Sequence, residues 1–452
     1  MSDAQGRNSD LETTRPARRT IEDRLRQMWR RSDEIFNILQ PQALHDQPIS
    51  LRHPVIFYLG HLPAFAWNQV CRGMLGQKSF HPDFDDLFER GIDPTGVDHH
   101  ACGKNWPSTA QVMAYRDRIR DALLDSAGAV RALSDSNILA ANDRIFEVVI
   151  EHELMHQETL QYMFQQLPSR AKRRPDDLPS LVFHGAAAEE HISIGGGPVH
   201  LGANFDEIPF GWDNEFPCHR TAVDDFKIDR TPVRVSRYQE FMDDGGYGRP
   251  ELWTSDDWAW RARLEIQGPS LWSRRNGEWF YDTLFGSVHI EDAADWPVQV
   301  GLAEARAYCR WAGSRLPTET EFHRAAYSTS EGLMRPFPWG HDPPTTIHGN
   351  FDFSHWAPTP VGSFPGGDSA WGVSELVGNG WEWTSSPFAP FPGFRAYISS
   401  YPGYSADFFD DRHFVMLGAS WATPAGLIRR SFRNWFQDHY PFVFATFRCV
   451  RS

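Results

Sequence analysis

The sequence predicts an α+β protein made of an N-terminal antiparallel four-helix bundle and an irregular C-terminal domain. Three observations lead to this fold class. Up to residue 168 the chain contains long runs in which apolar residues recur at helical spacing. From residue 190 onward these runs give way to short β-prone segments separated by Gly, Pro, Asp and Asn. The total of 452 residues also exceeds what one hydrophobic core usually supports.

The N-terminal elements follow in order. Residues 1–19 are polar and mixed in charge, so we expect a disordered tail. Residues 20–39 carry apolar side chains at helical intervals and predict a first amphipathic helix. Residues 54–70 are apolar almost throughout, with His61 near their centre, and predict a core helix. A titratable side chain in such a setting needs a partner.

Residues 78–107 are rich in Gly, Pro and His and predict a long loop, which in a compact domain is often functional. Residues 108–124 predict a third helix, with Ser108 as its N-cap. The run 145–164, free of Gly and Pro, predicts the fourth helix. We therefore assign residues 20–168 to the bundle, a fold that builds metal sites from side chains on facing helices.

The C-terminal part of the sequence has a different pattern of residue types. Residues 169–189 are basic, then acidic, and contain proline, which indicates a linker. Residues 190–452 form the second domain, with short helical patches at 236–242 and 302–312 and no fixed-period repeat. The chain contains 18 Trp and 32 Phe, so large buried aromatics are expected to hold this irregular domain together.

Charge and cysteine content limit the function. The formal charge of −15 argues against nucleic acid or an anionic membrane as a partner and favours small molecules. Five scattered cysteines without CxxC spacing indicate neither a disulfide framework nor a thiolate zinc site. No apolar run is long enough to cross a bilayer, and no secretory signal is apparent. We expect a cytoplasmic protein.

The fourth helix carries the candidate chemistry. His152 and His156, four residues apart, lie on one helical face and can reach a single metal ion. His61 on the apolar helix supplies a possible third imidazole. Glu158 lies about 200° further round than His156, so we expect it to contact a neighbouring helix or to have at most an outer role at the metal. The string also matches the HExxH zinc hydrolase signature, with Glu153 as general base.

Spacing alone leaves the metal and the reaction open, because imidazole ligands suit Zn, Cu, Fe and Ni alike. Hydrolases with the HExxH signature usually take a third ligand from downstream, and no histidine follows until His184. On these residues a zinc metallohydrolase therefore remains an open hypothesis.

More specific motifs lie in the C-terminal half. The motifs are WPVQV (296–300), SRLPTETEFHRAA (314–326), GVSELVGNGWEWT (372–384), LGASW (417–421) and RSFRNWF (430–436). Together they resemble the formylglycine-generating-enzyme fold, a C-type-lectin-like domain, so a lectin-like binding protein without catalysis is a further hypothesis. Joined to a DinB-like bundle with His-x3-His-x-Glu, this domain resembles the non-heme iron sulfoxide synthases of ergothioneine and ovothiol biosynthesis and their selenoneine-forming relatives.

The resemblance implies a ligand set and a reaction. Fe(II) would be held by His61, His152 and His156, with O2 as co-substrate. The reaction would join the imidazole carbon of hercynine, trimethylated histidine, to sulfur or selenium. Asn434 and Trp435 match the family's pair that helps to hold hercynine.

The family's ergothioneine-type members use a tyrosine as proton donor, and Tyr397 matches its spacing from that Asn-Trp pair. Tyr401 and Tyr404 lie in the same loop and are alternatives. All three could equally be packing aromatics.

The sequence departs from ergothioneine-type members at the donor site. Phe436 stands where those enzymes have an Asp, and Met155 stands where they have a Gln before the second helical histidine. The loop 98–106 offers Lys104 but no Arg. A site without cationic anchors favours a neutral selenosugar as chalcogen donor; the alternative is a thiol such as γ-glutamylcysteine or cysteine.

Overall fold

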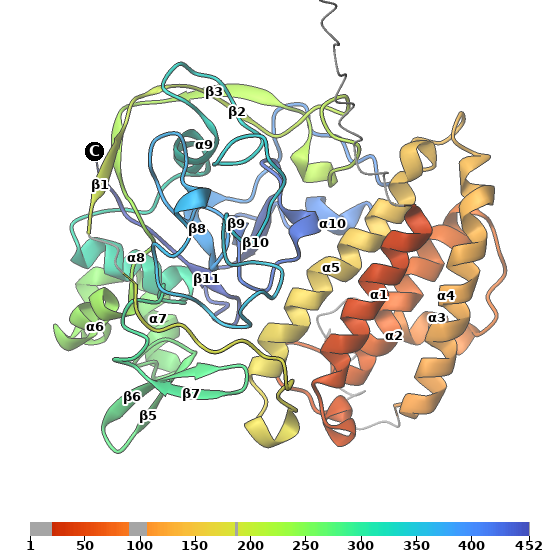
Figure 1. Ribbon diagram of the computed structural model, residues 1–452, viewed down its shortest axis with the longest axis horizontal. Helices are drawn as coiled ribbons and strands as arrows, with labels where there is room; N and C mark the ends of the chain where they lie inside the picture. Colours follow the sequence, from red (N-terminus) through yellow and green to blue (C-terminus); the bar gives the residue numbers. More distant parts are fainter. Residues whose placement is uncertain (1–19, 90–105, 186–188, 452) are drawn as a thin grey trace, which may run out of the picture.

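The computed structural model describes residues 20–89, 106–185 and 189–451, so the expected tail lies outside the described residues. A helical bundle and a domain of short sheets and helices lie side by side (Figure 1). The helix α5 (Arg144–Gln165) is on the side of the bundle that faces the second domain. Among the described helices, none is long and apolar enough to cross a membrane.

Two helices of the bundle begin directly after residues whose side chains cap them. α1 (Ile21–Asn37) follows Thr20, whose hydroxyl accepts a hydrogen bond from a backbone N–H of the first turn. α4 (Thr109–Arg131) follows Ser108, which forms a reciprocal capping box with Gln111. The predicted N-cap is confirmed, and the helix continues to Arg131 instead of ending near residue 124.

The second helix is buried on all sides. Every residue of α2 (Val55–Ala66) is buried, and the helix continues as a π-helical segment, η2 (Trp67–Met74). The expectation of an uninterrupted loop over residues 78–107 is wrong, since α3 (Pro82–Phe88) lies within it. α3 packs tightly against α2: a Cβ on Gly60 would lie 2.4 Å from the Phe88 ring.

The described residues of the C-terminal domain form four small sheets. The first sheet has the strand order β1-β4-β12, and all its pairs are antiparallel. The second has the order β10-β9-β8-β11 and is antiparallel except for the parallel pair of β8 and β11. The third is the antiparallel pair of β2 and β3, and the fourth is the antiparallel meander β5-β6-β7. The strand bounds are β1 His191–Ile194, β2 Gly197–Leu201, β3 His219–Val223, β4 Phe226–Asp229, β5 Trp272–Arg275, β6 Glu278–Thr283, β7 Gly286–His289, β8 Gly380–Pro387, β9 His413–Ala419, β10 Asn434–Gln437, β11 Ala445–Thr446 and β12 Val450–Arg451.

Short helices complete this domain, and two of them match the predicted helical patches. The helices are α6 Val235–Asp243, α7 Ser255–Arg263, α8 Leu302–Trp311, α9 Glu319–Tyr327 and α10 Gly403–Ala406. The predicted patches correspond to α6 and α8, whereas α7, α9 and α10 are additional. Residues 169–189, the expected linker, lie between α5 and β1, and residues 186–188 of it are outside the described part.

The two parts share one hydrophobic core. Buried residues of α1, α2, α4 and α5 belong to the same packed cluster as buried aromatics of the C-terminal domain. The largest fully buried side chains include Trp212, Trp296, Trp383 and Trp421. The high tryptophan content therefore fills the interior of an irregular domain that has little regular backbone pairing. A continuous core also fixes the bundle relative to the domain that faces it.

Candidate metal centre

The centre is built around α5. Successive residues of a helix turn by about 100°, so the side chains of α5 meet three different partners: α2, α1 and the C-terminal domain. Twenty-two residues in one helix provide six turns of such contacts. Each acidic or imidazole side chain of the segment 151–158 can therefore be assigned to one partner.

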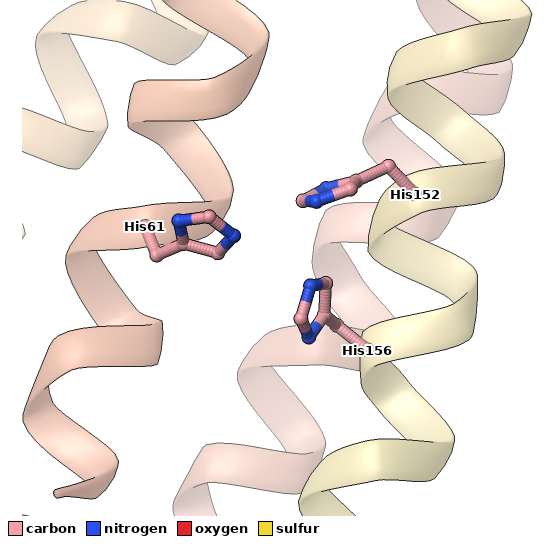
Figure 2. A group of neighbouring side chains, drawn as sticks. All are labelled: His61, His152 and His156. Carbon is pink, nitrogen blue, oxygen red and sulfur yellow. The ribbon is translucent and has the colours of Figure 1, made fainter. Parts of the chain in front are cut away.

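Three histidines converge between α2 and α5. His61 on α2 points toward His152 and His156 on α5 (Figure 2). One ring nitrogen of each histidine lies within 4.8 Å of the corresponding nitrogens of the other two. All three side chains are buried. The structure thus brings together the three histidines that were proposed from the sequence as metal ligands.

The protonation state of these rings suits metal binding. The Nδ1–H of His61 donates to the carbonyl oxygen of Phe88 at 2.8 Å, which leaves its buried Nε2 without a partner among the described residues. Burial lowers the pKa of His61 to about 4, against the opposing effect of that hydrogen bond. Burial and the neighbouring imidazoles lower the pKa of His152 and His156 well below the usual value. Neutral imidazoles with free lone pairs are the form that ligates a divalent metal, so the donor set fits one.

Aromatic rings hold the imidazoles in place. Phe57 stacks on His61 with ring centroids 5.0 Å apart, and Phe65 stacks on His152 at 3.6 Å with an interplanar angle of 9°. Such packing restricts the rotation of the imidazoles and excludes water from two sides of the group. The centre is therefore organised before any metal binds.

Glu153 points away from the histidines. Its carboxylate accepts a hydrogen bond from the hydroxyl of Ser32 on α1 at 2.6 Å, and both side chains are buried. Burial raises the pKa of Glu153, and the charge of Arg120 opposes that rise. A general base of the HExxH type would have to face metal-bound water, whereas this carboxylate is engaged on the opposite side, with α1.

Glu158 joins α5 to the second domain. Its buried carboxylate accepts hydrogen bonds from Trp381 Nε1 at 2.8 Å, Ser420 Oγ at 2.6 Å and Thr423 Oγ1 at 2.8 Å. We expected either a contact with a neighbouring helix or at most an outer role at the metal; the helix contact is wrong, because all three donors lie in the C-terminal domain. The position of Glu158 around the helix correctly indicated that its side chain faces away from the histidines. It could not indicate which element of the protein that side chain would contact.

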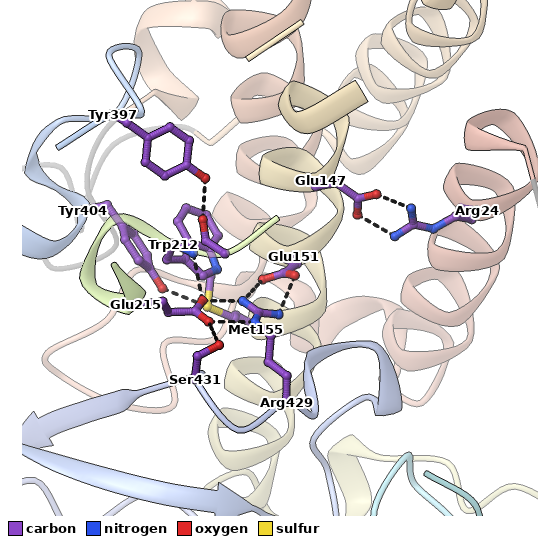
Figure 3. Close-up of polar contacts among 11 residues, drawn as sticks. Arg24, Glu147, Glu151, Met155, Trp212, Glu215, Tyr397, Tyr404, Arg429 and Ser431 are labelled. Carbon is purple, nitrogen blue, oxygen red and sulfur yellow. Dashed lines mark hydrogen bonds and ion pairs between the residues drawn. The ribbon is translucent and has the colours of Figure 1, made fainter. Parts of the chain in front are cut away.

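A second buried polar contact between α5 and the C-terminal domain was not predicted from the sequence. Arg429 pairs with the buried carboxylate of Glu151 at 2.7 Å and also with Glu215 of the C-terminal domain, which accepts a hydrogen bond from Ser431 as well (Figure 3). The partners of Arg429 are more than 200 residues distant in the sequence. The only sequence signal was the acidic residue directly before a ligand histidine.

The three candidate tyrosines occupy different surroundings. The hydroxyl of Tyr397 donates to the backbone carbonyl of Gly211 (Figure 3). Tyr404 directs its hydroxyl at the sulfur of Met155, 3.2 Å away. Tyr401 packs edge-on against Phe65, the ring that stacks on His152. Tyr401 and Tyr404 thus contact residues of the histidine-bearing elements, whereas Tyr397 is held by the C-terminal domain.

The other predicted substrate residues lie on β10. The side-chain oxygen of Asn434 accepts from the backbone N–H of Trp435. Trp435 stacks on Phe388 at 4.0 Å and meets Tyr404 edge-on at 5.2 Å. Phe436 stacks on Tyr440 at 5.1 Å. Lys104 and residues 98–105 of the predicted donor loop lie outside the described residues.

Two family models match the chain. The DinB superfamily matches residues 24–160, and the sulfatase-modifying factor enzyme 1-like domain matches residues 181–452. The expected fold class, a DinB-like bundle joined to a formylglycine-generating-enzyme-like domain, is therefore confirmed.

The chain is also similar to curated proteins along most of its length. A hercynine oxygenase of Mycolicibacterium smegmatis is 40% identical over 444 residues, which cover 94% of this chain and 96% of that protein. A hercynine oxygenase of Mycobacterium tuberculosis is 38% identical over 345 residues, covering 75% and 77%. Ergothioneine biosynthesis protein 1 of Neurospora crassa is 29% identical over 517 residues, covering 94% of this chain and 57% of that protein.

Proposed function

The chain belongs to the sulfoxide synthase family of ergothioneine biosynthesis and is an oxygenase; from this we propose that it joins the imidazole carbon of hercynine to a chalcogen atom in an O2-dependent reaction. The observation that carries the proposal is the buried group of three neutral imidazoles between α2 and α5. It combines an unsaturated ligand set with a position beside the C-terminal domain, since Tyr401 of that domain packs on Phe65, the ring that stacks on His152. Small-molecule sites commonly lie between domains.

We propose Fe(II) as the metal and His61, His152 and His156 as its ligands. When bound, ferrous iron supplies redox chemistry and open coordination positions for O2 and the substrates. The chain contributes the geometry: the Phe88 carbonyl fixes the tautomer of His61, and the stacked ring of Phe65 fixes His152.

The overall reaction balances without a further reductant. One imidazole C–H bond and one S–H or Se–H bond are broken, and one carbon–chalcogen bond is formed. These steps withdraw electrons from the two substrates, and O2 is the acceptor: one oxygen atom ends on the chalcogen and the other in water.

Hercynine recognition is assigned to the residues around Met155 and β10. The side-chain amide of Asn434 offers hydrogen bonds, and its neighbour Trp435 contributes to an aromatic group with Tyr404. Aromatic faces attract quaternary ammonium groups, and hercynine carries one. We propose that these residues hold the trimethylammonium end while the imidazole end faces the histidines.

For the chalcogen donor we propose a neutral selenosugar. Phe436 stacks on Tyr440, and Tyr162 of α5 meets both rings edge-on at 6.4 and 6.2 Å. An aromatic wall of this kind offers apolar faces for the C–H side of a sugar ring. The thiol alternative, γ-glutamylcysteine or cysteine, is supported by the similarity of the chain to hercynine oxygenases and to ergothioneine biosynthesis protein 1.

Parallel aerobic incubations with hercynine decide between the donors. We expect the iron-loaded protein to consume hercynine with a selenosugar and to consume little with γ-glutamylcysteine, as followed by mass spectrometry of the product. The variant Phe436→Asp is expected to improve the use of amino-bearing thiols, with Phe436→Leu as the control of similar polarity. Preferential turnover of γ-glutamylcysteine by the unmodified protein would overturn the selenosugar assignment.

The proton donor is proposed to be a tyrosine of the loop 397–404, with Tyr397 as the candidate from family spacing. Phenylalanine variants of Tyr397, Tyr401 and Tyr404 compared under one assay would identify it. The residue concerned should lose the coupled product while iron binding is retained; equal activity in all three variants would exclude this loop. We also place the reaction in the cytoplasm, in keeping with the free thiols of the described cysteines.

A further inference from the structure

The three candidate tyrosines lie in one loop, residues 397–404, which we call the tyrosine loop. Its backbone folds on itself by local turns: the N–H groups of Ser399, Tyr401 and Tyr404 each donate to a carbonyl two or three residues earlier. Bonds within a loop determine its shape but not its position. The distance of the tyrosines from the histidines therefore depends on the contacts that the loop makes with other segments.

A buried carboxylate holds the first residues of this loop. Asp213 begins the short helix η6 (Asp213–Glu215) and is 0% exposed. Its Oδ1 accepts hydrogen bonds from the backbone N–H groups of Tyr397 at 2.9 Å and of Ile398 at 3.1 Å. Burial raises the pKa of Asp213, and these two hydrogen bonds oppose the rise. Among the described residues no cation pairs with this carboxylate, so the two N–H groups are what stabilises its charge.

The residues on either side of Asp213 contact the same loop. The ring of Trp212 stacks on that of Tyr404, with the centroids 3.9 Å apart (Figure 3). The side-chain amide of Asn214 donates to the hydroxyl of Ser405, the residue directly after the loop, at 3.1 Å, and both side chains are buried. Three consecutive residues of one segment thus hold the tyrosine loop at both ends.

The same segment is also bound to the histidine-bearing helix. Glu215, two residues after Asp213, pairs with Arg429. Arg429 pairs in turn with Glu151, the residue directly before His152 on α5 (Figure 3). The segment that places the tyrosine loop is therefore connected to the helix that carries two of the proposed metal ligands.

We propose that Asp213 is a positioning residue, whose carboxylate holds the tyrosine loop at the distance from α5 at which one of its tyrosines reaches the bound substrates. This inference rests on the proposed function and on the tyrosine loop as the source of the proton donor. An apolar side chain at this position would avoid the cost of a buried charge, so the contribution of the carboxylate lies in the two bonds to the loop. A reacting group misplaced by about 1 Å can lose about a hundredfold in rate.

The first test observes the loop without turnover, by hydrogen–deuterium exchange of the metal-free protein. Asp213→Ala removes both bonds to the loop, whereas Asp213→Asn keeps an acceptor oxygen at the same place. The matched control is Glu375→Ala. Glu375 is 1% exposed, and one of its oxygens likewise accepts from two successive backbone N–H groups, those of Gly362 at 3.0 Å and Ser363 at 3.1 Å. Circular dichroism and melting temperature establish that each variant is folded.

We expect the amides of residues 397–404 to exchange about tenfold faster in Asp213→Ala and to stay within about threefold of the unmodified protein in Asp213→Asn. Glu375→Ala should accelerate exchange at residues 362–363 and leave the tyrosine loop unchanged. Unaltered exchange of the loop in Asp213→Ala would overturn the inference.

The second test separates positioning from general destabilisation, by the kcat for the coupled product. Asp213→Ala alone should lower kcat by about tenfold to a hundredfold, and Glu375→Ala should leave it unchanged. Asp213→Ala is then combined in turn with Tyr397→Phe, Tyr401→Phe and Tyr404→Phe. Where the proton-donating hydroxyl is already missing, Asp213→Ala should lower kcat further by less than about threefold, because no donor is left to misplace. In the other two backgrounds it should keep its full effect.

The same loss of kcat on Asp213→Ala in all three tyrosine backgrounds would overturn the inference, since a merely structural role acts equally in each. If Asp213→Ala is unfolded, Ser405→Ala, which removes only the bond from Asn214, decides in the same three backgrounds, with an expected loss of about threefold to tenfold. An unmodified protein that forms no coupled product would overturn the proposed function and the inference together. Failure of the inference alone leaves the unmodified protein active.

Discussion

Substitution of Gly60 by alanine should weaken metal binding although residue 60 has no side chain that could bind a metal. Gly60 lies where α2 and α3 approach each other, and it precedes His61. A Cβ built on Gly60 would lie 2.4 Å from two ring atoms of Phe88, whereas ordinary contacts begin near 3.4 Å. The ring, and with it the end of α3, must therefore shift by about 1 Å.

That shift acts on the metal centre through the backbone. The carbonyl of Phe88 accepts the 2.8 Å hydrogen bond that fixes the tautomer of His61. A displacement of about 1 Å takes this contact beyond hydrogen-bond distance. Loss of such an outer partner of a ligand histidine typically costs about 10- to 100-fold in metal affinity. Overpacking of α2 against α3 should also lower the free energy of unfolding by about 1–3 kcal/mol.

The assay is competition with a chelator for Fe(II), together with urea unfolding of the metal-free protein. Gly128→Ala is the matched control, because a Cβ added to this exposed glycine on α4 would meet nothing within 4 Å. It should keep its metal affinity and gain about 0.5–1 kcal/mol in stability. The double variant Gly60→Ala with Phe88→Leu, which removes the clashing ring, should recover part of the affinity. Unchanged metal affinity in Gly60→Ala, despite lower stability, would refute the role assigned to the Phe88 carbonyl.

Three further predictions concern the surroundings of the histidines. Arg429→Met leaves the carboxylates of Glu151 and Glu215 buried without their cation and should cost about 3–5 kcal/mol of unfolding free energy; a loss below about 1 kcal/mol in urea unfolding would contradict the importance of this ion pair. Glu153→Gln should keep its metal affinity and its hercynine turnover within about threefold of the unmodified protein. In a hydrolase that used Glu153 as general base, the same substitution would lower the catalytic rate by about a hundredfold or more. Loss of a peptide-hydrolysing activity in this variant would support the hydrolase. The metal-free protein should lose stability as pH falls from 6.5 to 4, because the pKa of His61 is about 4 in the folded state, so the unfolded chain binds more protons over this interval. The loss attributable to His61 is about 3 kcal/mol at most, and a pH profile of urea midpoints that coincides with that of His61→Phe would show that His61 titrates normally.

The sequence predicted α1, α2, α4 and α5, because apolar residues at helical spacing are a local signal. Thr20 and Ser108 cap α1 and α4 because their hydroxyls act within one turn, and such signals can be recognised without tertiary structure. α3 was missed because its seven residues are too few to show a helical period. The registers of the C-terminal strands could not be predicted, since most of these strands have only two to six residues and pair with partners distant in the sequence.

In the candidate site, too, the residues with a local sequence signal could be predicted, and those placed by long-range packing could not. His152 and His156 were recognisable because helical spacing alone puts them on one face. His61 could be proposed because an imidazole in an apolar helix requires a partner, but its position opposite the pair depends on the packing of α2 on α5. The Phe88 carbonyl has no side-chain signature at all, and Arg429 reaches Glu151 from 278 residues away. Groups defined only by long-range packing are the part that a single sequence does not reveal.

The central claim is that a three-histidine iron site couples hercynine to a chalcogen donor. The most direct measurement is mass spectrometry of aerobic reactions containing hercynine, a selenosugar or thiol donor, and either the iron-loaded protein or its His61→Ala variant. We predict a product in which the imidazole carbon is bonded to the chalcogen, formed only with O2 and only by the protein that retains His61. Absence of this product with every donor, or its undiminished formation by His61→Ala, would contradict the account.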